Sequence, residues 1–206
     1  MGVRTPLLRV AIAAALFTVV ALAWRGQLVR VGSDEAPRPL VLIDQAERRV
    51  LRCDVVLPTV PVGMTRVHSG GTPLLIHYWA PWERNGRVQA AALDSLVNLL
   101  AATDLRVVLV SSDPFPSVAR FVQRQRLKLR VLLDGPGLLR AQVPRPQLPH
   151  TVLIGRDGST AVLQSGEVDW LAPATRAALE IVIGEARPGP APTAPAPLAT
   201  PPRATL

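Results

Sequence analysis

The pattern of hydrophobic and polar positions changes its period several times along the chain, and each change marks an expected element. Residues 74–79 are continuously apolar, which is typical of a buried central strand. Apolar side chains then recur at helical spacing over 88–100, and residues 105–111 form another apolar run. Further elements are expected over 113–126, 129–133, 151–164 and 173–185. This alternation of strand and helix predicts an α/β fold with a parallel sheet and covered faces.

The segment that precedes the first buried strand has a different pattern. Residues 40–43 and 50–57 are short apolar runs, and the polar residues 44–48 lie between them. We expect two strands joined as a β-hairpin. Pro58, Pro61 and the glycines that follow predict irregular backbone between this hairpin and the central strand.

The first 25 residues predict a signal anchor. Residues 10–24 are apolar apart from Thr18, and arginines flank them. This length is near the short limit for a transmembrane helix. A cleaved signal peptide is the alternative, because residues 21–23 fit a small-x-small cleavage site, but the bulky Trp24 directly after that site favours the anchor. Either interpretation places the remaining chain outside the cytoplasm.

Composition divides the rest of the chain into three parts. Residues 26–38 contain Gly, Ser, Asp, Glu and Pro and are expected to be a linker. Residues 39–186 carry the strand and helix patterns and form the predicted domain. Residues 187–206 are mainly Pro, Ala and Thr, a composition that cannot bury much apolar surface and predicts disorder.

Charge and cysteine content exclude several classes of function. The net charge is +8, but the arginines are scattered singly, so nucleic-acid binding is not predicted. Cys53 is the one cysteine of the chain, which rules out an intramolecular disulfide. His68, His77 and His150 show no metal-ligand spacing, and we predict neither a metal nor a cofactor.

Residues 79–87 form the segment in which a functional site is expected. They read Trp-Ala-Pro-Trp-Glu-Arg-Asn-Gly-Arg between the central strand and a helix. This order resembles the active-site segment of the thioredoxin-like superfamily, in which a strand leads through Trp-Ala-x-Trp-Cys-x-x-Cys-Arg into a helix. The closest likeness is to membrane-anchored periplasmic thiol-disulfide oxidoreductases of the TlpA/ResA type. In this alignment Glu83 and Gly86 replace the two cysteines.

A second segment, residues 147–158, strengthens the resemblance. Pro149 matches the cis-proline that precedes a strand in these proteins, and Asp157-Gly158 forms a hairpin turn before the returning strand. The lead-in to the last helix at 166–170 is also similar to the TlpA type. Over 39–186 the resemblance implies a thioredoxin-like α/β fold: a central mixed β-sheet flanked by helices, with an N-terminal β-hairpin and, before it, a transmembrane helix.

The resemblance also implies a location and a binding groove, although the dithiol reaction itself is excluded. Disulfide exchange needs an attacking thiolate and a resolving thiol, and Glu83 and Gly86 supply neither. We therefore expect a non-catalytic peptide- or protein-binding or assembly module, anchored in the inner membrane with its domain in the periplasm. The candidate groove residues are Trp79, Trp82, Glu83, Arg84, Asn85, Pro149 and His150.

Several alternatives remain open at this point. Glu83 is expected to cap the helix, a charge–dipole contribution of about 0.3–1 kcal/mol. It could instead form an acid–base or cation site with His150. Cys53 is expected to be a partly buried small hydrophobe, and the alternative is a redox activity that uses this lone thiol or a thiol supplied in trans. The Pro-rich tail could also dock a partner during assembly.

Overall fold

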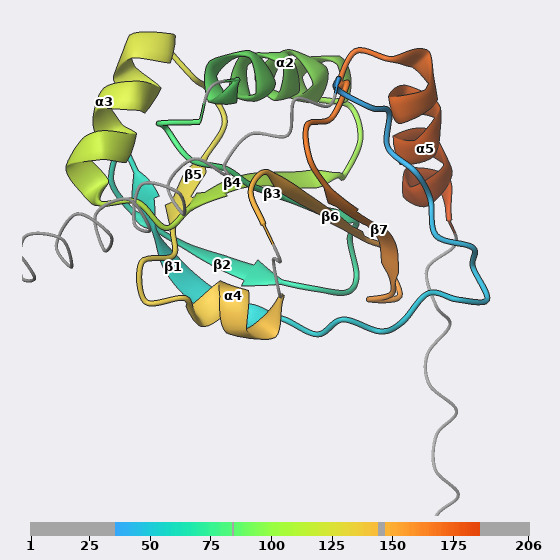
Figure 1. The fold of residues 1–206 in the computed structure, drawn as a ribbon. Helices are drawn as coiled ribbons and strands as arrows, with labels where there is room; N and C mark the ends of the chain where they lie inside the picture. Colours follow the sequence, from blue (N-terminus) through green and yellow to red (C-terminus); the bar gives the residue numbers. More distant parts are fainter. Residues whose placement is uncertain (1–35, 84, 144–146, 186–206) are drawn as a thin grey trace, which may run out of the picture.

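The computed structural model describes residues 36–83, 85–143 and 147–185. A seven-stranded sheet runs through this part of the chain in the order β2-β1-β5-β4-β3-β6-β7 (Figure 1). The strands are β1 (Asp54–Val60), β2 (Met64–His68), β3 (Leu74–Tyr78), β4 (Arg106–Ser111), β5 (Val131–Leu133), β6 (His150–Ile154) and β7 (Thr160–Ser165). The helices are α2 (Gly86–Leu99), α3 (Phe115–Gln125), α4 (Leu138–Gln142) and α5 (Pro173–Gly184).

The central strand β3 is buried along its whole length, as its continuous apolar run predicts. It pairs in parallel with β4 and antiparallel with β6. The sheet is therefore mixed, as the family resemblance implies, rather than parallel throughout. β6 and β7 are joined by the tight turn at Asp157-Gly158 and pair antiparallel as a hairpin, and β1 pairs antiparallel with both β2 and β5.

Helices cover both faces of the sheet, and the sheet divides the hydrophobic core into two layers. In Figure 1, α2, α3 and α5 lie on one face and the short α4 lies on the other. Trp79, Leu93 and Trp170 belong to the core cluster of the first face. Tyr78 and Leu139 belong to the cluster of the second face. Successive strand residues thus point to opposite layers, which is why both faces of β3 need apolar side chains.

A hairpin is present at the N-terminal side of the domain, but only the second of the two predicted strands, 50–57, overlaps one of its strands, β1. Residues 40–43 form no strand, and the hairpin consists of β1 and β2. The earlier segment runs along β7 instead, where the Ile43 amide donates to the Ala161 carbonyl at 2.8 Å. Leu40 is anchored there because its amide donates to the Thr175 hydroxyl at 3.1 Å. Contacts with β7 and α5 therefore outweigh local pairing, and hydrophobic pattern alone does not report them.

The turn of this hairpin contains residues that the sequence pattern predicts as irregular backbone after the hairpin. Pro58 lies inside β1 opposite Met64, and the Val60–Pro61 peptide bond is cis. Gly63 has φ +145°, a conformation that favours glycine. Proline and glycine here shape a turn within a hairpin rather than ending the β-structure.

Both predicted terminal segments lie outside the described residues. These are the signal anchor over 1–25, with most of the linker, and the tail over 187–206. Among the residues that are described, no helix is long and apolar enough to cross a membrane.

Candidate functional site

The turn between β3 and α2 positions the candidate site. The amide of Glu83 donates to the Ala80 carbonyl, and the amide of Gly86 donates to the Glu83 carbonyl, each at 3.1 Å. Asn85 then stands at the helix N-cap, although its side chain makes no capping hydrogen bond. This tight turn brings the backbone so close that a Cβ placed on Gly86 would lie 2.8 Å from the Ala80 oxygen. No larger residue fits at position 86 without a shift of the backbone.

Glu83 is a buried carboxyl group rather than a helix cap. The residue is 7% exposed, and neither carboxyl oxygen has a hydrogen-bond partner within the described residues. Burial raises the pKa of Glu83 to about 7, and the nearby charge of Glu167 acts in the same direction. The prediction that Glu83 caps α2 is therefore wrong. The N-cap position of α2 is Asn85, and no side-chain hydrogen bond caps the helix.

Asn85 links this turn to the segment that follows β7. Its Nδ2 donates to Oε1 of the buried Glu167 at 2.6 Å. A second link lies one turn into α2, where Oε1 of Gln89 accepts from the amide of Val168 at 3.2 Å. Sequence reasoning missed Gln89 and Glu167, because their partners are about eighty positions away along the chain. Neither residue carries a local signal of these contacts.

The loop before β6 contains Pro149, and the peptide bond that precedes this proline has the predicted cis geometry. The Leu148–Pro149 bond is cis, and the Pro149 carbonyl accepts from the Gly166 amide at 2.9 Å. The loop leads into β6, which places His150 directly opposite Tyr78 in the sheet. Pro149 itself is buried, so its ring does not form an open surface.

His150 lies in the sheet rather than in a groove. It is 1% exposed, and its Nδ1 lies 3.0 Å from the Ser165 hydroxyl. No hydrogen bond joins it to Glu83, whose carboxyl oxygens have no partner in the described part of the chain. The hypothesis of a Glu83–His150 acid–base or cation site is therefore not supported. β6 continues directly from the proline loop, and this directs His150 into the packed interior.

The two tryptophans of the motif have different environments. Trp79 is 1% exposed and packs against Phe121 with a ring-centroid distance of 4.4 Å. Trp82 is 58% exposed, and its Nε1 donates to Asp113 Oδ1 at 3.1 Å. Trp79 thus belongs to the core, and Trp82 with the half-buried Asn85 remains on the surface. Arg84 lies outside the described residues.

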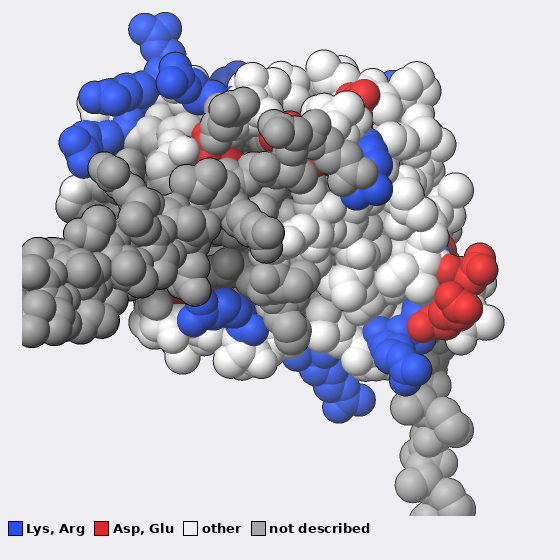
Figure 2. Space-filling model, in the orientation of Figure 1, with Lys and Arg blue, Asp and Glu red and all other residues white. Residues whose placement is uncertain are grey.

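Basic side chains gather beside Trp82. Figure 2 shows them over α3 at the upper left of the molecule. They include Arg120 and Arg124 on α3 itself, both of which are exposed. Sequence reasoning missed this group because its arginines are spread along two helices and form no run.

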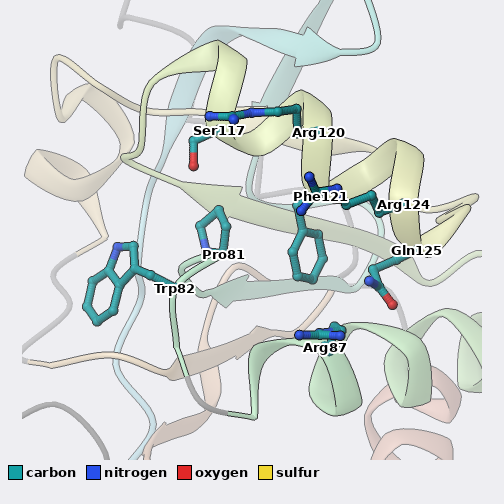
Figure 3. A pocket seen from close by; sticks show the side chains of 8 residues that line it. All are labelled: Pro81, Trp82, Arg87, Ser117, Arg120, Phe121, Arg124 and Gln125. Carbon is teal, nitrogen blue, oxygen red and sulfur yellow. The ribbon is translucent and has the colours of Figure 1, made fainter.

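A cavity of about 340 Å³ lies between this part of α3 and the turn before α2 (Figure 3). Its lining consists of Pro81, Trp82, Arg87, Ser117, Arg120, Phe121, Arg124 and Gln125. It contains one residue of the predicted groove, Trp82. The accessible surface of the site therefore lies beside α3, whereas the sequence predicts it at the loop that contains Pro149.

Cys53 lies on the other face of the sheet. It is 3% exposed and belongs to the core cluster on the α4 side. Burial raises the pKa of its thiol, and hydrogen bonds with Ser69 only partly oppose this effect. A protonated, buried thiol is a small hydrophobe, in agreement with the favoured interpretation of this residue.

Comparison with known proteins identifies the fold. No protein-family model matches the chain, and no curated protein sequence matches it. Solved structures do match, among them a candidate thiol:disulfide interchange protein DsbE from Chlorobium tepidum, with a TM-score of 0.59 and 18% identity over 67% of this chain and 99% of that one. StoA from Bacillus subtilis has a TM-score of 0.52 and 16% identity over 59% and 94%. Peroxidoxin BcpB from Mycobacterium tuberculosis has a TM-score of 0.53 and 22% identity over 64% and 95%.

These matches confirm the thioredoxin-like fold, which is the fold predicted from the two sequence segments. They extend over nearly the whole length of the matched chains. At such low identity they show the fold and carry no activity with it.

Proposed function

We propose that this chain is a thioredoxin-like binding module of the TlpA/ResA type that has no thiol-disulfide exchange activity of its own. One observation carries the proposal. At the N-terminus of α2, where a thiolate would have to stand, Glu83 is a buried carboxyl group and Gly86 is packed against the Ala80 carbonyl. The assignment of these two positions to the replaced cysteines comes from the sequence resemblance.

The remaining thiol is badly placed for disulfide exchange at α2. Cys53 packs in the core layer on the α4 side, whereas Trp79, which leads into the turn, packs in the opposite layer. Burial raises the pKa of its thiol and so lowers the fraction of nucleophilic thiolate. These observations argue against the alternative in which Cys53 acts as a monothiol.

The surface beside the turn supports the binding role. Trp82 presents an exposed aromatic ring, and its hydrogen bond to Asp113 fixes the orientation of that ring. A rigid aromatic side chain offers a large contact area at a small cost in conformational entropy. We propose that an extended peptide segment of a partner protein lies across Trp82 and the half-buried Asn85.

Location and anchoring complete the proposal. The apolar residues 10–24 would hold the chain in the inner membrane, and the domain would face the periplasm. The partner is then a periplasmic or membrane protein with an accessible extended segment. The proposal includes no nucleic acid, metal or cofactor.

A binding experiment tests the role of Trp82. The full chain in detergent micelles is titrated into a labelled pool of short, cysteine-free, neutral peptides, and fluorescence polarisation is recorded. Trp82→Ala should weaken binding at least about fivefold, because exposed aromatic anchors dominate interface energies. Val88→Ala is the matched control, since Val88 is an exposed apolar residue near the start of α2 that does not line the cavity. Equal affinities of the two variants would contradict the proposal.

A further inference from the structure

The cavity beside Trp82 has a basic rim formed by two helices that face each other. Arg87 comes from the first turn of α2, and Arg120 and Arg124 come from successive turns of α3. All three are exposed. In Figure 3 the α3 arginines lie on one side of the Phe121 ring and Arg87 lies on the other. Arg120 lies along α3, where its Nε donates to the Pro116 carbonyl at 3.1 Å, and all three arginines line the same cavity.

No acidic side chain neutralises these arginines within the described residues. The cavity lining contains no carboxylate. Other arginines of the domain do form ion pairs with acidic residues, namely Arg48, Arg66, Arg156 and Arg176. Asp113 accepts from Trp82 Nε1 and Asp94 accepts the amides of Lys128 and Leu129, and neither forms an ion pair with these three arginines in the described part of the chain. The rim therefore has a positive charge that is available to an anionic ligand.

Part of the cavity wall is apolar, although most of the lining residues are polar. Phe121 is 9% exposed, and its ring reaches the cavity between Pro81 and Arg87 (Figure 3). Trp82 adds a second aromatic surface at the edge. A small apolar area next to guanidinium groups suits a ligand that has a short aliphatic stem and a terminal carboxylate.

We propose that this cavity is a subsite for an acidic side chain, Asp or Glu, of the partner peptide that binds across Trp82. The inference rests on the proposed function and adds the chemistry of the partner. The methylene groups of the acidic residue would pack on Phe121 and Trp82. Its carboxylate would accept hydrogen bonds from two or more of the three arginines, whose planar donors match a carboxylate.

The shape of the site favours a peptide over other polyanions. A volume of 340 Å³ is at the small end of the range for ligand pockets, about 300–1,000 Å³. The charged groups converge on this volume from two elements instead of spreading over one flat face. A phospholipid surface or a nucleic-acid backbone binds more readily to an extended basic face. The shared residue Trp82 also makes the cavity continuous with the proposed peptide surface.

Matched peptide pools test the subsite. Three labelled, cysteine-free pools differ only in carrying Glu, Gln or Lys at every third position, and each is titrated with the full chain in detergent micelles. The Glu pool should bind about fivefold more tightly than the Gln pool, and the Lys pool should bind more weakly than both. In Arg120→Gln/Arg124→Gln the ratio of the Glu and Gln affinities should fall to about one. Arg87→Gln, on the other helix, should lower the same ratio.

A control pair separates this site from general charge attraction. Lys128→Gln/Arg130→Gln removes the same number of exposed charges just beyond α3, outside the cavity lining, and should keep the wild-type ratio. Equal Glu and Gln affinities in the wild-type chain would overturn the inference. An equal loss in both double variants would also overturn it. Circular dichroism of each variant shows whether the fold is intact.

Two further outcomes distinguish a failure of the proposed function from a failure of the proposed subsite. If Trp82→Ala leaves the Gln pool unaffected while the Glu preference persists, the proposed function fails and the anionic subsite stands alone. Phosphatidylglycerol vesicles and a single-stranded RNA are tested with the same variants. If either binds in a way that depends on Arg120 and Arg124 and the wild-type chain has no Glu preference, the subsite has another ligand and the inference is wrong.

Discussion

Asn85 Nδ2 lies 2.6 Å from Glu167 Oε1, and this hydrogen bond joins the start of α2 to the segment after β7. Both residues have limited exposure, and Glu167 is buried. The bond holds the turn that carries Trp82 against the rest of the domain. A single side-chain amide thus supports a carboxylate in the interior and positions the surface that we propose for binding.

Loss of this bond should destabilise the domain. Asn85→Ala leaves Glu167 Oε1 without its donor, and we expect the free energy of unfolding to fall by about 1–3 kcal/mol. Urea denaturation followed by circular dichroism measures the change. Asn98→Ala is the control, because Asn98 is exposed and its side chain donates to the Asp94 carbonyl one turn before it on α2, and it should change stability by at most about 0.5 kcal/mol. Similar losses in the two variants would argue against the role of Asn85.

Glu83 should make the domain less stable as the pH rises. Its pKa is raised from 4.5 to about 7 in the folded chain. Below about pH 4.5 the group is protonated in both states and contributes no pH dependence. Between about 4.5 and 7 the unfolded chain loses a proton that the folded chain retains, so the free energy of unfolding falls and then levels off, at a cost on the order of 2 kcal/mol.

A neutral variant isolates this effect. Glu83→Gln should be more stable than the wild type at about pH 8, and most of this difference should disappear at about pH 4. Urea denaturation at both pH values provides the comparison. A difference that is the same at both pH values would show that Glu83 does not titrate in this window.

The tryptophans of the motif should respond differently to truncation. Trp79→Ala removes a fully buried ring and should cost about 3–5 kcal/mol of stability. Trp82→Ala removes a mostly exposed ring and one hydrogen bond, and should cost about 1 kcal/mol or less. Thermal or urea unfolding distinguishes the two. If Trp82→Ala is as damaging as Trp79→Ala, Trp82 is a structural residue and the proposed binding surface is wrong.

Gly86 should reject any side chain, including that of a restored cysteine. A Cβ at this position would meet the Ala80 carbonyl oxygen at 2.8 Å, so Gly86→Ala should cost about 1–3 kcal/mol. Gly184→Ala is the matched control at the end of α5, where a Cβ meets nothing within 4 Å, and it should be neutral or stabilising. The free energy of unfolding of both variants tests this. A tolerated Gly86→Ala would show that the turn can relax.

Much of the fold could be predicted from the sequence because its strongest signals are local. The apolar run of β3, the helical spacing of α2 and the Asp157-Gly158 turn each identify an element by period or by turn chemistry. The prediction was wrong over 40–43, where a short apolar run packs along β7 instead of forming a strand. Runs of this length are decided by tertiary contacts, which the local pattern does not contain.

The candidate site was only partly predictable for the same reason. The resemblance correctly predicted the cis peptide bond before Pro149. Trp79 and His150 were expected in a groove, but they point into the interior, because burial depends on what packs against a side chain. Arg120 and Arg124 were missed, since the cavity beside Trp82 exists only when α3 lies next to the turn before α2.

Disulfide exchange is the measurement that tests the central claim most directly. The full chain in detergent micelles is added to insulin and dithiothreitol, next to a thioredoxin-like enzyme that has both cysteines. Because neither Glu83 nor Gly86 can exchange and Cys53 is buried, insulin should be reduced at the uncatalysed rate, and Cys53→Ser should make no difference. An acceleration by the wild-type chain that Cys53→Ser abolishes would contradict this account.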